Sequence, residues 1–157
     1  MSPPSQRPGR SKQDYGTPRE FIAAVERRWG KLTFDLAASK ENTVTRDFLS
    51  IEQDSLKQNW TLLGCGPLWL NPPFADIRPW AEKAEKESTY TTLLMLVPAS
   101  VGSNWYAEHA MRMARTIFLR PRLTFVGCSA PYPKDLMLLE FGTIWSGEFE
   151  SWRWDRW

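Results

Sequence analysis

The stretch TLLMLV (92–97) sets the strongest limit on the fold, because it carries five apolar side chains in a row. A strand with one solvated face alternates apolar and polar residues, whereas an unbroken apolar run of strand length is buried on both faces. The stretch therefore predicts a fully buried strand of the kind found in parallel sheets.

Strand-like and helix-like segments alternate along the rest of the chain. The apolar patterns predict further strands at 32–36, 67–70, 116–126 (one strand or two) and 136–141, and helices at 17–30, 55–60, 77–88 and 103–115. Strands that alternate with helices indicate an α/β protein with a parallel sheet, and a hairpin can form near the end.

The first helix carries start and stop signals. Thr17 is a predicted N-cap, Pro18 suits the first helical position, and Glu20 can complete a capping box. Gly30 is predicted to end the helix.

The length of 157 residues corresponds to one domain. Residues 1–13 are rich in Pro, Ser and Arg, and they predict a disordered basic tail before a domain at 14–157.

Several function classes do not fit this composition. The two cysteines, Cys65 and Cys128, are too few for a disulfide framework and lack metal-ligand spacing. The one histidine, His109, is expected on a helix surface, and neither a hydrolase triad nor a metal site is predicted. Without a membrane-length apolar run or a signal peptide, we expect a cytoplasmic protein.

The net charge is only +2, but the basic residues are unevenly distributed. The cluster Arg112, Arg115, Arg120 and Arg122 can bind the phosphates of DNA, or it can be a solvated surface.

The stretch LWLNPPF (68–74) is the main candidate for a functional site. In open α/β sheets, ligands bind beyond the carboxyl ends of the strands, where Asn71 is predicted to lie. The two prolines stiffen the turn, so the Asn71 side-chain oxygen and the Pro72 carbonyl can accept both hydrogens of an amino group. Phe74 offers a face for a planar ring. The site suits a rigidly held aromatic amine such as adenine.

An exocyclic amino nitrogen is a poor nucleophile because its lone pair is delocalised into the ring. Hydrogen bonds from both N–H groups favour a pyramidal nitrogen and localise the lone pair toward an electrophile. Positioning and electrostatics can then carry the reaction, with an activated methyl on a sulfonium as a suitable electrophile.

NPPF resembles motif IV of the S-adenosylmethionine-dependent amino-group methyltransferases, and the chain resembles the bacteriophage-type DNA N6-adenine methyltransferases. The similar blocks, in order, are DYGTPREF (14–21), FDLAAS (34–39), DSLKQNW (54–60), WLNPPF (69–74), LMLVPAS (94–100) with Trp105, and RLTF (122–125).

This resemblance implies a Rossmann-like methyltransferase fold, with a mostly parallel sheet and helices on both faces. It implies S-adenosyl-L-methionine as the cofactor and Asn71, Pro72, Pro73 and Phe74 as the catalytic block. The residues expected to bind the cofactor are Tyr15, Thr17, Pro18, Asp35, Ala37 and, at the adenine amino group, Asp54.

The sequence departs from the family pattern in two places. Motif I is usually glycine-rich, whereas FDLAASKEN (34–42) has no glycine. The span from Asp35 to Asn71 is short for the usual two strands and helices. The ribose ligand is therefore not evident, and Glu41 and Asn42 are the candidates.

Structural roles compete with several of these assignments. The NPPF stretch can be a turn that closes a strand, Asp35 can cap a turn, and Asp54 can be a helix N-cap. Trp105 is expected in the core. The final segment FESWRWDRW (149–157) can be a lid, a DNA-stacking element or, as we favour, an edge strand that packs Trp152 and Trp154.

The predicted function is methyl transfer to the N6 amino group of adenine in double-stranded DNA. The target nucleotide must be flipped out of the duplex to reach such a site. The sequence shows no separate target-recognition domain. The DNA site would then be recognised by loops, or the enzyme has relaxed specificity, or it acts as a homodimer. The alternatives are a methyltransferase of RNA or of protein glutamine, and a non-catalytic nucleic-acid-binding protein of the same fold. A phage-encoded enzyme would act in the host cytoplasm.

Overall fold

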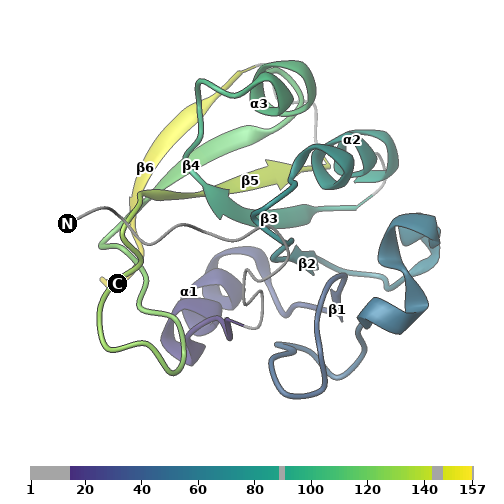
Figure 1. Ribbon diagram of the computed structural model, residues 1–157, viewed down its shortest axis with the longest axis horizontal. Helices are drawn as coiled ribbons and strands as arrows, with labels where there is room; N and C mark the ends of the chain where they lie inside the picture. Colours follow the sequence, from purple (N-terminus) through teal and green to yellow (C-terminus); the bar gives the residue numbers. More distant parts are fainter. Residues whose placement is uncertain (1–14, 89–90, 143–146, 157) are drawn as a thin grey trace.

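A computed structural model describes residues 15–88, 91–142 and 147–156, and it contains a six-stranded sheet flanked by helices (Figure 1). The strand order is β1-β2-β3-β5-β4-β6. The strands are β1 (Phe34–Asp35), β2 (Leu68–Leu70), β3 (Leu93–Pro98), β4 (Arg115–Arg120), β5 (Leu136–Phe141) and β6 (Phe149–Arg153).

The sheet is mixed, but only one of its six strands runs against the others. The pairs β1–β2, β2–β3 and β4–β6 are parallel, whereas β5 is antiparallel to both β3 and β4. The α/β class is confirmed, but the sheet is mixed, with three parallel and two antiparallel pairings. β4 and β5 form an antiparallel pair near the end of the chain, where a hairpin was expected. The carboxyl ends of β1, β2, β3 and β4 consequently share one edge of the sheet.

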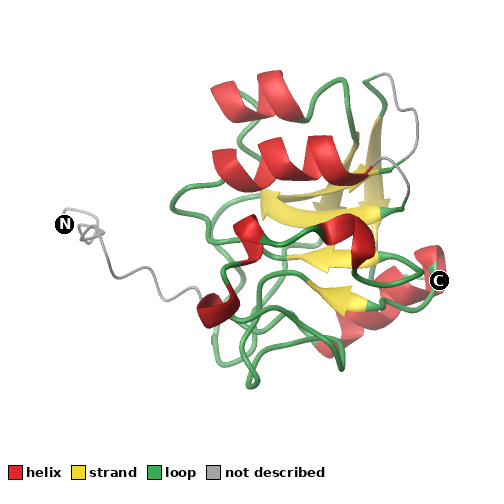
Figure 2. Ribbon diagram, turned by 90° about the vertical axis from the view of Figure 1, so that its right-hand side faces the viewer, coloured by secondary structure: helices red, strands yellow, loops and turns green. Residues whose placement is uncertain are grey.

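Helices cover both faces, as predicted (Figures 1 and 2). Alternate residues of β3 point to opposite sides, because side chains along a strand alternate. Leu93 and Met95 share one cluster of buried side chains with α2 (Arg78–Glu87), whereas Leu94 shares the other with α1 (Arg19–Trp29). All six residues of β3 are buried, which confirms the interpretation of its apolar run.

The start of α1 differs from the prediction. The N-cap is Pro18, not Thr17, and no side chain caps the helix, so the predicted capping box with Glu20 is wrong. The Pro18 carbonyl accepts hydrogen bonds from Phe21 and Ile22, each at 3.1 Å. The side chain of Thr17 is buried away from the helix end. Gly30 ends the helix at φ 90°, as expected.

The predicted helix 103–115 is too long. α3 spans Asn104–His109 only, and β4 already begins at Arg115. His109 is partly buried rather than on an open surface, and its Nδ1 lies 2.7 Å from a carboxylate oxygen of Glu85 in α2. This contact joins α3 to α2.

The segment between β1 and β2 contains no α-helix. It forms three short 3₁₀ turns, η1 (Ile51–Gln53), η2 (Ser55–Lys57) and η3 (Trp60–Leu62), where one short helix was predicted. Trp60 anchors the segment: its indole N–H donates to the Ser55 carbonyl at 3.0 Å, and its ring is buried.

The final strand β6 packs at the sheet edge beside β4, as predicted. Trp152 lies 5.4 Å from Trp29 between ring centroids, and Trp154 lies 5.3 Å from Phe21. Arg28 of α1 donates two hydrogen bonds, of 2.7 and 2.6 Å, to Glu150. These contacts attach the edge strand to α1.

The sequence also led to expectations for the N-terminal tail, the cysteines, metal sites and membrane spans. The predicted basic tail (1–13) lies outside the described residues. Cys65 and Cys128 are free and exposed. Among the described residues, no group of His, Cys, Asp and Glu is arranged to hold a metal ion, and no helix has the length and hydropathy of a membrane span.

Phe21 tests the packing of α1 on the sheet, since its side chain is fully buried. We expect Phe21→Ala to lower the free energy of unfolding by about 3–5 kcal/mol, because it removes a buried ring and leaves a cavity. The matched control is Phe149→Ala, at a position where the side chain is 56% exposed, with an expected cost below about 1 kcal/mol. Urea unfolding measures both, and similar losses would contradict this packing.

Candidate functional site

The NPPF elbow stands at the sheet edge where the carboxyl ends of the parallel strands meet. Asn71 follows β2 directly and is half-buried, while Pro72 is buried. The elbow is therefore accessible, and cavities open on both sides of Asn71.

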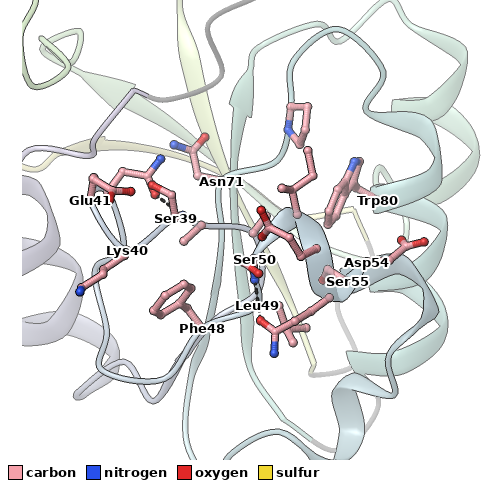
Figure 3. A pocket seen from close by; sticks show the side chains of 17 residues that line it. Ser39, Lys40, Glu41, Phe48, Leu49, Ser50, Asp54, Ser55, Asn71 and Trp80 are labelled. Carbon is pink, nitrogen blue, oxygen red and sulfur yellow. Dashed lines mark hydrogen bonds between the residues drawn. The ribbon is translucent and has the colours of Figure 1, made fainter.

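The first cavity, cavity A, has a volume of about 560 Å³. Figure 3 shows Asn71 between Ser39–Glu41 on one side and Asp54, Ser55 and Trp80 on the other. The lining also includes Ala37, Ala38, Asn42, 48–53 and Pro73. The chain after β1, the 3₁₀ turns and α2 thus enclose a space that Asn71 also lines.

The second cavity, cavity B, has a volume of about 820 Å³ and is rich in aromatic rings. Phe74 and Tyr132 meet edge to face at 5.8 Å between ring centroids, and Phe125 stacks on Tyr15 at 5.5 Å. The lining also includes Asn71, 75–78, Pro72, Pro98, Ser100, 103–105 and Lys134. Flat apolar walls beside the Asn71 amide suit a planar ring that carries an amino group.

Asn71 is common to both cavities. A group held in cavity A and a ring held in cavity B would therefore meet at this side chain. This arrangement can support direct transfer between two bound molecules, without a covalent intermediate on the protein.

Thr17 contacts Asn71 across the site. The Asn71 Nδ2 atom lies 3.5 Å from the Thr17 hydroxyl oxygen, and Thr17 is buried. A small cavity of about 10 Å³ separates these residues from Asp35. The hydroxyl that was predicted to cap α1 instead lies against the amide, where it can accept a hydrogen bond and limit the rotation of Asn71.

Asp35 is buried at the end of β1. Its carboxylate accepts hydrogen bonds from the backbone N–H of Ala37 at 3.3 Å and of Val44 at 3.1 Å. Burial nevertheless dominates and raises the pKa of Asp35 from 3.8 to about 7. The carboxyl therefore has a structural role in the turn, as the alternative interpretation held, and it also borders the small cavity beside Asn71.

Asp54 lies at the far end of cavity A from Asn71 (Figure 3). It has a left-handed backbone at φ 46° and pairs with Lys57 at 2.9 Å. Its side chain makes no N-cap hydrogen bond to η2. Glu41 and Asn42, the two candidates for binding the ribose, both line cavity A. The Asn42 side-chain oxygen also stabilises the turn, because it accepts a hydrogen bond from the Ser39 N–H at 2.7 Å.

The other expected cofactor residues are divided between the cavities. Ala37 lines cavity A. Tyr15 lines cavity B and the small cavity, and Pro18 is buried at the start of α1.

The four arginines of the basic cluster are not brought together. Arg115 begins β4 and lies near Glu140, Glu148 and Glu150 at 3.6, 3.9 and 3.1 Å. Arg120 ends the same strand, so the two are separated by roughly 17 Å at 3.3–3.4 Å per residue. Arg112 is exposed in the turn after α3, whereas Arg122 follows β4 and pairs with Asp135 at 2.9 Å. Only Arg120 and Arg122 stand at the carboxyl end of β4.

Several lining residues carried no clear signal in the sequence. Trp80 lies on the first turn of α2 and lines cavity A, while Tyr132 and Lys134 reach cavity B from the connection before β5. Trp105 packs against the core as predicted and also lines cavity B. Phe125 also lines cavity B and belongs to the RLTF block (122–125), the block by which the sequence indicated this part of the site.

Comparison with known proteins gives consistent matches. A family model described as DNA N-6-adenine-methyltransferase (Dam) matches residues 4–135. A DNA N-6-adenine-methyltransferase of Escherichia phage T1 is 37% identical over 112 residues, which are 70% of this chain and 46% of the relative. Another, of Haemophilus phage HP1 (strain HP1c1), is 28% identical over 89 residues, which are 55% of this chain and 49% of the relative. The chain spans about half the length of these curated relatives.

Asp35 should make the stability of the protein depend on pH. Its folded pKa of about 7 lies above the ordinary 3.8, so the folded state binds the proton more tightly. The contribution of Asp35 to stability is therefore full below about pH 4 and is lost as the pH rises to about 7, by about 4 kcal/mol at 1.36 kcal/mol per pKa unit.

The control is Asp35→Asn, which cannot ionise. Urea unfolding at pH 4 and pH 8 gives the difference in unfolding free energy between the wild type and the variant at each pH. The contributions of the titrating groups that both proteins share cancel in this difference. We expect the wild type to be less stable relative to the variant at pH 8 than at pH 4. A difference that does not change with pH would contradict the raised pKa.

Proposed function

The chain belongs to the DNA N-6-adenine-methyltransferase (Dam) family, and from that premise we propose that it transfers a methyl group from S-adenosylmethionine to the N6 amino group of adenine in DNA. The observation that carries the proposal is the position of Asn71, which borders both cavity A and cavity B. A methyl donor in one cavity and a base in the other would meet at this residue.

The mixed sheet supports a Rossmann-like methyltransferase fold. Five of its six strands run in one direction, and the site lies at their carboxyl edge. The short segment from Leu36 to Pro67 forms 3₁₀ turns in place of the further strands and helices expected for this fold.

In this proposal, cavity A holds the cofactor. Ala37 and Asn42 lie near Asn71, and Asp54 and Trp80 lie toward the other end, which matches a ligand with a charged end and an aromatic end. The buried carboxyl of Asp35 would favour a cationic group beside it, because a nearby positive charge stabilises the carboxylate. When bound, S-adenosylmethionine supplies the activated methyl group.

Cavity B fits the target adenine. The Asn71 side-chain oxygen and the Pro72 carbonyl would accept hydrogen bonds from the two hydrogens of the amino group. Phe74 would stack on the base, with Tyr132 at its edge. A base held in this cavity must leave the duplex, and stacking and hydrogen bonding here would offset part of the cost of flipping.

The chain's own residues would act by positioning. Two acceptors on the amino hydrogens favour a pyramidal nitrogen, which directs its lone pair away from the acceptors and toward cavity A. Asn71 and Pro72 are neutral acceptors held on a stiff elbow, so they need no reorganisation during transfer.

Asn71→Ala tests the proposal. We expect the variant to lose transfer to DNA by about 10²–10³-fold, the usual effect of removing one preorganised hydrogen-bonding group. Folding and cofactor binding should be retained, since Asn71 is only half-buried. The matched control is Asn59→Ala, the same change at an exposed N-cap of η3 that accepts hydrogen bonds from Thr61 and lines neither cavity A nor cavity B, with expected full activity.

The measurement is incorporation of labelled methyl groups into DNA, with RNA and protein as alternative acceptors, followed by sequencing that detects modified adenine. Full activity of Asn71→Ala on DNA would overturn the mechanism. Methylation of RNA or protein by the wild type, but not of DNA, would overturn the substrate.

Thr17 gives a separate prediction about positioning. Thr17→Val keeps the shape of the side chain but removes the oxygen that lies 3.5 Å from Asn71 Nδ2. We expect the kcat for DNA to fall about tenfold, equal to 1.36 kcal/mol in the barrier, and Thr17→Ser to restore it. Steady-state kinetics and calorimetry with S-adenosylmethionine separate two roles. A weaker cofactor Kd with unchanged kcat would show that Thr17 serves cofactor binding instead.

A further inference from the structure

The connection between β4 and β5 is much longer than the geometry requires. The two strands are antiparallel neighbours, which a turn of two to five residues can join. β4 ends at Arg120 and β5 begins at Leu136, so the connection, here named the β4–β5 loop, spans the fifteen residues 121–135. Loops of this length in compact domains are commonly functional.

The base of the β4–β5 loop is fixed to the domain. Leu123 and Phe125 are buried, and the Tyr132 N–H donates to the Leu123 carbonyl at 2.8 Å. Phe125 and Tyr132 meet edge to face at 5.7 Å, and both line cavity B. The loop is therefore part of the wall of the proposed base-binding cavity.

Val126, next to Phe125, is held in place but points outward. Its N–H donates to the Gly16 carbonyl at 2.9 Å, and Gly127 turns the chain at φ 83°. A Cβ atom on residue 16 would lie 3.2 Å from the Val126 Cβ, so Gly16 permits this close approach. The Val126 side chain is nevertheless 63% exposed. A stiff, β-branched apolar side chain therefore projects into solvent beside the cavity.

The charges of the loop that carries Val126 favour an anionic partner. The stretch 120–135 holds Arg120, Arg122 and Lys134 against one acid, Asp135, which pairs with Arg122. Lys134 also lines cavity B. Cations that precede and follow an exposed apolar side chain in one loop suit a DNA duplex, with phosphates at the cations and stacked bases at the apolar side chain.

We propose that Val126 enters the DNA duplex and fills the space that the flipped adenine leaves, while Arg122 and Lys134 contact the flanking phosphates. This inference rests on the proposed function and assigns a role to a residue outside both cavities. Apolar side chains inserted between base steps unstack them at a cost of a few kcal/mol. Val126 would thus stabilise the extrahelical state of the base without touching the reacting atoms.

The test compares Val126→Ala with the wild type on two probes of the same sequence, a duplex oligonucleotide and the single strand. The oligonucleotide contains the site identified by sequencing methylated genomic DNA. We expect kcat/KM on the duplex to fall about tenfold, equal to 1.36 kcal/mol, and kcat/KM on the single strand to stay unchanged. In a duplex with 2-aminopurine at the target position, the fluorescence rise that reports flipping should shrink.

Leu62→Ala is the matched control, because Leu62 is an exposed apolar residue at 78% in η3. It should behave as the wild type on both probes. Unchanged calorimetric binding of S-adenosylmethionine would verify that Val126→Ala is folded.

Two results would overturn the role of Val126 in flipping. One is equal activity of the variant and the wild type on the duplex. The other is an equal loss on duplex and single strand, which would indicate that Val126 only supports the cavity wall. A wild-type protein that methylates neither probe would instead overturn the proposed function itself.

Discussion

The pairing of β2 between β1 and β3 is the constraint on which the rest of the site depends. Backbone hydrogen bonds hold β2 from both sides, and buried side chains cover both of its faces. Asn71 is the first residue beyond this support, and Pro72 fixes the backbone that follows it. The amide is therefore presented from a strand that is paired on both edges and buried on both faces. Precise placement would matter for the proposed reaction, which uses positioning in place of a strong base.

Asp35 is a carboxyl group that is buried near Asn71 at a cost in stability. A carboxyl with a pKa near 7 destabilises the folded protein at neutral pH, although two backbone N–H groups partly compensate. In the proposed function, a cationic group bound beside Asp35 would offset this cost, because a nearby positive charge stabilises the carboxylate. Thr17 follows the same pattern, because its hydroxyl lies near Asn71 and does not cap α1.

The sequence predicted the elements whose signals are local. The apolar run of β3, the glycine that ends α1 and the position of Asn71 after β2 depend on neighbouring residues, and each is confirmed. Predictions failed where tertiary contacts decide. The pattern at 103–115 looked helical throughout, but α3 ends at His109, a turn follows at 110–113, and Arg115 already pairs with Glu140 of β5. The walls of cavity B join residues from four distant segments, and no single stretch could reveal that Phe74 and Tyr132 meet.

The attachment of β6 to α1 links the far edge of the sheet to the site. Trp152 and Trp154 rest on Phe21, at ring-centroid distances of 6.0 and 5.3 Å, and Phe21 follows Thr17 by four positions. Loosening the last strand would free the front of α1 and, through it, the hydroxyl beside Asn71. The outer edge of the sheet and the Thr17–Asn71 contact are thereby mechanically connected through a single helix, although they lie toward opposite ends of the strand order.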